Sequence, residues 1–492
     1  MRRDFAIMLA LLIAAVGVVP WAHGTVNEAK DQVEIRETIL YGDSFWAEGL
    51  EVGFNTKYED SLYWNTTFWP GTDKKAETKF SYYHPMMENT PDDQAEQKVV
   101  TVKLHIPSDE FQMYDTSFAY IQELEGTNEK DGNYYYNLMY RPVVDLRDRM
   151  EEKETRTEVV SLSQYYDYYP MALTFDVPMR YIKTQGSIFD TLDDIFRIPI
   201  PEDHKMRVTV ERGWSGGKKD SAEGERVSKG SSPIYRLEYN YVLTEDSFYF
   251  LICNQVDGEK TLDFSQFRDG YGIYGVPLEQ TGTMTWLPLE QLELCYSIDE
   301  TAVTVYSFQW NEEREELLLL TEEAGSMWLT IIDERTLDTI QKIELVSWVY
   351  PLDLFYYPDF LAIKTIEQQI LIVAAEEDGW KLQCVIPTDE LSMSISTIEG
   401  TELAWDGKRL AIATGAWGNL PREMEVAICT EDGLLFYADY GTKEEEATLN
   451  TEGNNYTRWQ RYDPGVEMQS AVPITVTWEN ETKGKGILCV RD

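Results

Sequence analysis

Short apolar runs separated by polar turns occupy most of the chain, and the pattern is clearest between residues 314 and 412. Most runs contain β-branched or aromatic residues, and most end at a cluster of polar residues. Runs of this length bounded by turn residues are typical of β-strands joined in hairpins. The pattern predicts strands over residues 317–320, 327–332, 339–345, 369–375, 380–386, 425–430 and 434–440, and a further strand-and-turn unit over 404–413.

Asp-Gly pairs lie beside several of these runs. Glycine accepts the positive φ of a type I′ turn, so Asp-Gly between two apolar runs is a strong hairpin signal. We therefore expect hairpin turns at the pairs that begin with Asp257, Asp378, Asp406 and Asp432.

The N-terminal half is also rich in strand patterns but less regular. A hairpin is expected over 49–68, and alternating strands over 98–106, 117–124 and 133–140. One helix is predicted over 187–197, capped by Ser187, because its apolar positions share one helical face. Two segments have the composition of exposed loops, namely 145–158, which could also form a short helix, and 212–233.

The five cysteines suggest a repeat. Each lies inside an apolar run, and the first four are 42, 89 and 45 residues apart. A repeat of about 40–50 residues with four strands in each unit indicates propeller blades. No two cysteines are close in sequence, so we expect free, buried thiols in separate blades rather than a disulfide framework. The cysteines are Cys253, Cys295, Cys384, Cys429 and Cys489.

One of these units carries a family resemblance. Residues 328–340, with Asp333, Thr336 and Leu337, resemble the strand, Asp-x-x-Thr-Leu, strand unit of quinoprotein-like and YVTN-type β-propellers. The resemblance is close over one repeat and implies architecture rather than chemistry. The tryptophan-docking residues of quinoprotein repeats are not regularly present, so no quinone cofactor is implied.

The predicted fold is therefore all-β, a multi-bladed β-propeller. Residues 33–492 would hold seven or eight blades at about 45–60 residues each. Ring closure requires strands near 33–40 or 51–56 to share a sheet, or to lie in adjacent blades, with the last strand near 472–478. The alternative is two separate β domains with their boundary at 212–233.

The N-terminus has the pattern of an export signal. Arg2 and Arg3 precede an apolar run over residues 5–19, and the small residues Ala22 and Gly24 follow. Residues 1–24 are thus expected to be a signal peptide or a retained single-pass anchor helix, followed by a linker over 25–32. The apolar run is shorter than the roughly 20 residues of a spanning helix, so both readings stay open. The rest of the chain is expected on the extracellular side, touching the membrane only through residues 5–21.

The net charge of the chain limits the classes of partner that are expected. Eighty-seven acidic residues against 43 basic ones give a formal net charge of −44, which repels phosphate backbones. Nucleic acid is therefore an unexpected partner. The acidity either serves solubility or favours cationic ligands and calcium. Clustered oxygens at 128–133 and 190–194 could hold calcium, but neither segment fits the twelve-residue calcium loop, and no cofactor is predicted.

Motifs for catalysis are weak. Residues 213–217 match G-x-S-x-G, but no helical pattern and no histidine follow, as a nucleophile elbow requires. The histidines are scattered and match no metal-binding spacing, so no metal site is predicted. Catalytic and ligand-binding residues thus stay unknown. The histidines are His23, His84, His105 and His204.

Aromatic clusters lie at 134–136, 165–169 and 355–357. Tyrosine on an exposed loop suits sugar or peptide recognition, although tyrosine is also a common strand residue. Neighbouring strand residues face opposite ways, so at least one ring of each cluster is expected to point outward.

By elimination, we expect a non-enzymatic binding protein of the cell envelope whose partner is a protein, a peptide or a glycan. The alternative is an exported carbohydrate-active enzyme with two catalytic carboxylates, which the sequence cannot choose among so many acids.

Overall fold

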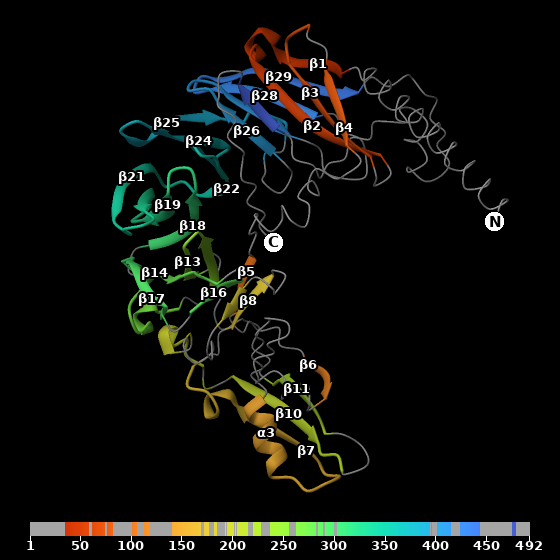
Figure 1. Cartoon of the computed structure of the whole chain (residues 1–492), viewed down its shortest axis with the longest axis vertical. Coiled ribbons are helices and arrows are strands. Elements are labelled where there is room, and N and C mark those ends of the chain that lie inside the picture. Colours follow the sequence, from red (N-terminus) through yellow and green to blue (C-terminus); the bar gives the residue numbers. More distant parts are fainter. Residues whose placement is uncertain are drawn as a thin grey trace, which may run out of the picture. The chain divides into compact units, whose positions relative to one another are not determined.

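The structure is a computed structural model. It describes residues 35–58, 62–73, 76–81, 101–105, 113–117, 140–168, 172–176, 182–184, 192, 194–200, 202, 204–214, 220–227, 237–254, 262–281, 284–288, 291–299, 303–393, 395, 401–414, 424–442 and 475–478. These residues form an all-β protein of mostly antiparallel sheets with few helices (Figure 1). The chain divides into two compact units, one of residues 1–97 and 349–492 and the other of residues 98–348.

The first unit contains two sheets in which antiparallel strands follow one another in chain order. Their central strands are the most apolar, and every side chain of β27 is buried. The first sheet consists of β22 (Pro351–Tyr356), β23 (Phe360–Thr365), β24 (Gln369–Glu376) and β25 (Gly379–Pro387). The second consists of β26 (Thr401–Trp405), β27 (Leu410–Thr414), β28 (Met424–Thr430) and β29 (Gly433–Thr442).

The two ends of the chain meet in this unit. β1 (Ile35–Gly42) adds a fifth strand to the second sheet by pairing antiparallel with β29 (Figure 1). β30 (Thr475–Trp478) pairs with β2, with Leu50 opposite Trp478 and Gly53 opposite Thr475. The expected sharing of one sheet by N- and C-terminal strands is confirmed. This sheet has the order β30, β2 (Leu50–Tyr58), β3 (Leu62–Phe68) and β4 (Glu77–Ser81).

Two apolar cores stabilise the first unit. One lies between the sheet of β26–β29 and the sheet that the chain ends form, and includes Leu50, Val426 and Trp478. The other joins the opposite face of β26–β29 to β22–β25 and includes Ile372 and Cys429. The β26–β29 sheet is therefore buried on both faces, which explains why its strands are continuous apolar runs.

The second unit contains two further sheets of four strands. One has the order β12 (Leu237–Leu243), β13 (Ser247–Asn254), β14 (Gly272–Pro277) and β17 (Glu293–Ser297). The other has the order β18 (Val303–Asn311), β19 (Glu316–Glu323), β20 (Ser326–Asp333) and β21 (Thr339–Ser347). One core, which includes Phe250, Phe308 and Leu317, joins them.

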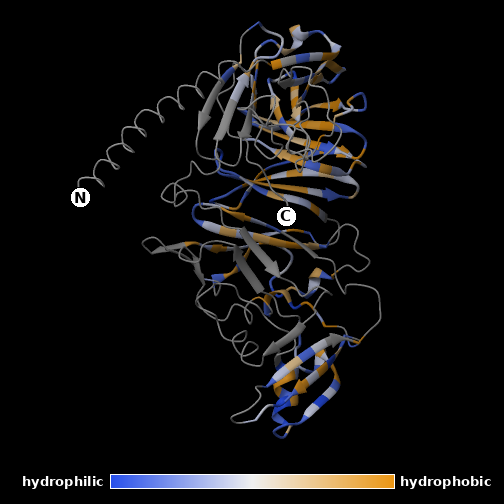
Figure 2. Ribbon diagram, turned by 90° about the vertical axis from the view of Figure 1, so that its right-hand side faces the viewer, coloured by the Kyte–Doolittle hydropathy of each residue, from blue (hydrophilic) through white to orange (hydrophobic). Residues whose placement is uncertain are grey.

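A sheet with one covered face completes the described core of this unit. Its order is β6 (Met113–Ser117), β11 (Ser221–Arg226), β10 (Lys205–Glu211) and β7 (Thr155–Ser161), and α3 (Tyr140–Asp148) packs against β7 and β10. Side chains of β10 alternate between buried and exposed, as expected for a sheet with one solvated face. Figure 2 shows this alternation as blue and orange residues at the lower end of the view.

Smaller elements fill the remainder. β5 (Thr101–His105) pairs with β8 (Ala172–Asp176), and β16 (Met284–Leu287) lies between β15 (Glu279–Thr281) and β9 (Ile182–Thr184). The β9–β16 pair is parallel. Short 3-10 helices are η1 (Ser44–Ala47), η3 (Leu162–Gln164) and η4 (Phe264–Gln266).

The hairpins predicted at Asp378, Asp406 and Asp432 are present, and Asp257 lies outside the described residues. Their turns are not of type I′, because only the glycine after each aspartate has positive φ. A turn with two positive φ angles occurs instead at Ala324 and Gly325, between β19 and β20.

The Asp-x-x-Thr-Leu motif forms a hydrogen-bonded turn between β20 and β21. Asp333 Oδ1 accepts from the backbone N–H of Arg335 at 3.0 Å and of Thr336 at 2.8 Å. Leu337 has φ +58°, and its N–H donates to the Asp333 carbonyl. The motif is therefore a local turn device, in agreement with its reading as architecture.

Other sequence predictions need correction. Residues 221–226, predicted as loop, form β11, and the 145–158 segment contains the end of α3 and the start of β7. Residues 212–233 fall within the unit of residues 98–348, and the domain boundary proposed there stays a prediction. Within the predicted helix 187–197, the described residues 192 and 194–196 are helical.

Cys253, Cys295, Cys384 and Cys429 are free thiols, as predicted. They do not all occupy separate sheets, because Cys253 on β13 and Cys295 on β17 share one. Cys489 lies outside the described residues.

The described residues contain no helix that is long and apolar enough to cross a membrane. The predicted signal or anchor over 1–24 and the linker over 25–32 lie outside them.

Candidate functional site

Among the described carboxyl groups, Glu402 has the burial and the fixed hydrogen bond that are typical of a functional site. It lies half-buried on β26, which is the edge strand of its sheet. Its Oε2 accepts a hydrogen bond of 3.1 Å from Tyr357 Oη, which comes from the turn between β22 and β23. Tyr357 Oη also accepts from the N–H of Leu403 at 2.8 Å, and its ring stacks on Phe360 with centroids 4.4 Å apart. The carboxyl is therefore held in one position by a fixed donor.

The surroundings change the chemistry of this pair. Burial raises the pKa of Glu402 to about 7, while the hydrogen bond from Tyr357 acts in the opposite direction. Burial and the Glu402 carboxylate hold the pKa of Tyr357 well above its usual range, so Tyr357 remains a donor. A carboxyl that exchanges its proton near neutral pH can act as a general acid or receive a cationic or hydroxyl-bearing ligand.

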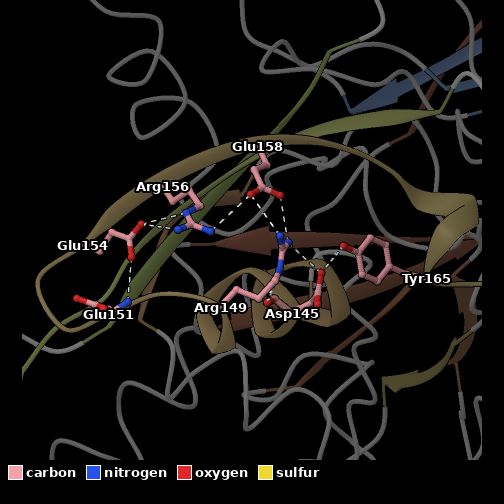
Figure 3. Close-up of polar contacts among 7 residues, drawn as sticks. All are labelled: Asp145, Arg149, Glu151, Glu154, Arg156, Glu158 and Tyr165. Carbon is pink, nitrogen blue, oxygen red and sulfur yellow. Dashed lines mark hydrogen bonds and ion pairs between the residues drawn. The ribbon is translucent and has the colours of Figure 1, made fainter.

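A second polar cluster lies on the second unit and joins α3 to β7 (Figure 3). The guanidinium of Arg149 bridges Asp145 Oδ2 at 3.0 Å and Glu158 Oε2 at 3.1 Å. Asp145 Oδ2 also accepts from Tyr165 Oη at 2.8 Å. Burial and Asp145 raise the pKa of Tyr165 to about 12, so it stays protonated.

The cluster continues along β7 through a second arginine (Figure 3). Arg156 donates to Glu154 Oε1 at 2.7 Å, and Glu154 Oε2 accepts from the N–H of Glu151 at 2.9 Å. These groups satisfy one another at the surface, where such pairs contribute little free energy. We interpret the cluster as the fastening of α3 to its sheet rather than as a ligand site.

The structure around the G-x-S-x-G segment does not support a hydrolase role. Gly213 N–H donates to Asp220 Oδ1 at 2.7 Å, which closes the loop between β10 and β11, and Asp220 also binds Arg147. The element after this segment is the strand β11, whereas a nucleophile elbow needs a helix there. Residues 215–217 themselves lie outside the described residues.

Candidate metal ligands are not brought together. His204 is buried, Asp194 is bound by Arg197 and Arg268, and His23, His84 and residues 128–133 lie outside the described part. Among the described residues, no group of three or more His, Cys, Asp or Glu side chains is placed to hold a metal ion.

The aromatic clusters lie mainly inside the fold. Tyr166 is buried beneath the guanidinium of Arg141, 4.7 Å from its ring centroid, and Phe355 belongs to the core of the first unit. The described aromatic members of 165–169 and 355–357 are buried or half-buried. The expectation that one ring of each cluster points outward stays a prediction, and residues 134–136 lie outside the described part. Sequence reasoning did not select Glu402, whose one local signal is a lone acid within the apolar run 401–405.

No protein-family model matches the chain, and no curated protein matches it in sequence. Solved structures with similarity include the β-propeller domain of the Trilobed protease from Pyrococcus furiosus, at 11% identity and TM-score 0.21, covering 48% of this chain and 67% of that one. The Dos1 propeller has 8% identity and TM-score 0.22, covering 48% and 63%. Acylaminoacyl peptidase from Pyrococcus horikoshii has 10% identity and TM-score 0.21, covering 48% and 37%. None of these singles out the quinoprotein-like or YVTN kind of propeller.

Proposed function

We propose that this chain is a β-propeller protein, exported or held at the membrane by its N-terminal segment, that binds a protein, peptide or glycan of the cell envelope. The observation that carries the proposal is the joining of the chain ends. β2 pairs with β30, and β1 pairs with β29, beside sheets of four strands that follow one another in sequence. Closure by strands from both ends is what a ring of blades needs to avoid unpaired edges.

The net charge of the chain limits the chemical class of ligand that it would bind. At −44, the chain favours a cationic partner and disfavours anionic ones. Within the first unit, Glu402 supplies a carboxyl that is charged above about pH 7 and neutral below it. A basic peptide or an amino-bearing glycan therefore matches the charge of the protein better than a neutral ligand.

The full chain should be tested on peptide and glycan arrays at low and high salt. We expect saturable binding to basic peptides or amino sugars that weakens as salt rises, because exposed charges are screened. Protease added to intact cells should degrade the chain, since its bulk would face outward. Absence of any binder together with a clear turnover activity would overturn the binding role.

A second function, an exported carbohydrate-active enzyme, is favoured by one observation. Glu402 has the raised pKa and the fixed geometry that a general acid for glycoside cleavage requires. The variant Glu402→Gln should then lower the turnover of a responsive glycoside about a hundredfold or more. Glu376→Gln, which changes an exposed acid paired with Lys381, is the matched control. Equal activity of both variants and the parent would remove this candidate.

A further inference from the structure

An exposed apolar surface lies where the chain enters the first unit. Five large apolar side chains within eight residues are between 38% and 64% exposed, on β1 and η1. Phe45 and Trp46 form an edge-to-face pair with ring centroids 5.7 Å apart. We call this surface the β1–η1 patch; it consists of Ile39, Leu40, Tyr41, Phe45 and Trp46.

The aromatic side chains of the patch are not needed to form η1. The Phe45 N–H donates to Asp43 Oδ1 at 2.9 Å, and the Trp46 N–H donates to the Asp43 carbonyl at 3.1 Å. Arg409 Nη1 donates to the Trp46 carbonyl at 2.7 Å. All these contacts use backbone atoms of residues 45 and 46, so polar side chains would permit the same turn. The requirements of folding therefore do not explain why these aromatic rings are exposed to solvent.

The strand that precedes η1 displays its side chains in a fixed way. Ile39 pairs with Ala438 and Tyr41 with Tyr437, so Leu40 is an additional residue that bulges from the ladder. Gly42 follows with φ +76°, and a Cβ there would lie 1.9 Å from the carbonyl oxygen of Leu435. The backbone that carries the patch is thus fixed by its pairing with β29 and by the close approach of Gly42 to Leu435.

We propose that the β1–η1 patch rests in the interface of the lipid bilayer that the N-terminal segment enters. The inference rests on the proposed function, because it requires residues 5–19 to be retained in the membrane. Only residues 20–34 separate that apolar run from Ile35, which keeps Ile35 within about 50 Å of the membrane even when they are fully extended.

The composition of the patch matches this occupant. Tryptophan and tyrosine are enriched at membrane interfaces, where their rings meet the head groups, and phenylalanine and leucine serve on the apolar face. Two acidic neighbours are engaged by the protein, since Asp43 caps η1 and Glu37 accepts from Tyr440 Oη, while a third, Glu48, is exposed. The net charge of −44 selects zwitterionic rather than anionic lipid.

Photochemical crosslinking can test the contact on the full chain. The protein is reconstituted in phosphatidylcholine vesicles that contain a phospholipid with a photoreactive head group, and crosslinked peptides are located by mass spectrometry. We expect crosslinks within residues 39–46, reduced about tenfold by the double variant Phe45→Ser, Trp46→Ser. Ile366→Ser removes a side chain that is 57% exposed in the same unit and should leave the crosslinks unchanged.

The outcomes separate the two proposals. If the chain stays with the vesicles and residues 5–19 are crosslinked while 39–46 are not, the patch proposal fails and membrane anchoring stands. If the chain does not associate with vesicles, anchoring fails and the patch proposal fails with it. A change from dimer to monomer in the double variant, without lipid crosslinks, would assign the patch to a second copy of the chain and overturn the lipid contact. Unchanged thermal unfolding of the double variant shows that the fold is intact.

Discussion

At the residue scale, the position of an acid decides its behaviour more than the number of acids does. Several described carboxyls have a lowered pKa because a base lies beside them, as Arg268 does for Asp194 and Lys381 for Glu376. Glu402 is different, since burial raises its pKa and its one fixed partner is the hydroxyl of Tyr357. Such a carboxyl changes its charge near neutral pH.

This behaviour predicts a pH dependence of stability. The pKa of Glu402 rises from its ordinary 4.5 to about 7 on folding, so the neutral carboxyl favours the folded state. Its contribution is fully present below about pH 4.5 and is lost as the pH rises through about 7. The loss is on the order of 3 kcal/mol at about 1.4 kcal/mol per pKa unit. Urea unfolding of the parent and of Glu402→Gln should be measured from pH 4 to pH 8. As the pH rises, the free energy of unfolding of the variant should increase relative to that of the parent.

Tyr357→Phe provides the matched control. It removes the donor that favours the Glu402 carboxylate, so the pH-dependent loss should shift to higher pH. Parallel pH profiles of the parent and Glu402→Gln would show that Glu402 titrates normally.

The burial of the cysteines predicts that their thiols are protected from alkylation. Burial raises the pKa of Cys295 and Cys384 to about 11 and that of Cys429 to about 12, and Cys253 is buried. Since the thiolate is the reacting form, these thiols should resist alkylation at pH 8 in the native protein and react on unfolding. Intact mass of the Cys489→Ser variant, which removes the thiol outside the described residues, gives the count of adducts. Fast native alkylation, or a mass that shows a disulfide, would contradict this.

At the scale of elements, strand periodicity predicted the hairpins of the C-terminal half because these strands are buried and end in local turn signals. The missed elements depend on distant partners. β11 has the sequence SAEGER, without an apolar run, and it is a strand because β10 and β6 pair with it. α3 was obscured by its charges, although Val143 and Leu146 reach the core. Glu402 could not be found for the same reason, since the hydroxyl that positions it is 45 residues away.

The turn between β19 and β20 offers a test of local backbone strain. Ala324 has φ +51° and Gly325 φ +84°, and a left-handed conformation costs a residue with a Cβ about 1–2 kcal/mol. Asparagine adopts this conformation more readily, so Ala324→Asn should raise stability by about 0.5–1 kcal/mol. Gly325→Ala should lower stability, because it adds strain and places a Cβ 3.0 Å from the ring of Trp348. Thermal unfolding of both variants decides, and a stabilising Gly325→Ala would contradict the turn geometry.

At the scale of the whole molecule, the first unit is built from two separate parts of the chain. One of its cores combines residues from 47–68 with residues from 404–478, whereas the other consists of residues from 355–437 alone. Arg409 joins these parts, because it binds Asp406 at 2.7 Å, the Trp46 carbonyl at 2.7 Å and the face of Trp478, 3.9 Å from its centroid.

Two fragments of the chain should therefore assemble. Co-expressed fragments 1–97 and 349–492 are expected to purify together through a tag on one of them, since β1–β29 and β2–β30 pairing and a shared core link them. Arg409→Met should weaken the complex by about 1–3 kcal/mol, as expected for the loss of a cation–π contact and charged hydrogen bonds. Arg335→Met changes an exposed arginine outside both fragments and, tested in the full chain, should leave its thermal unfolding unchanged. Fragments that purify separately would refute the assembly.

The pairing of the two chain ends also sets an order in time. Strands β1 and β2 are synthesised early, but β29 and β30 are among the last described segments to emerge. At about 5–20 residues per second, β2 waits roughly 20–80 s for its partner. Throughout that interval the edge of β2 in the sheet of β2, β3 and β4 has no partner strand, and an unpaired edge can pair with another chain. A product that ends before residue 475 lacks the strand that pairs with β2 on this edge, so the sheet cannot be completed.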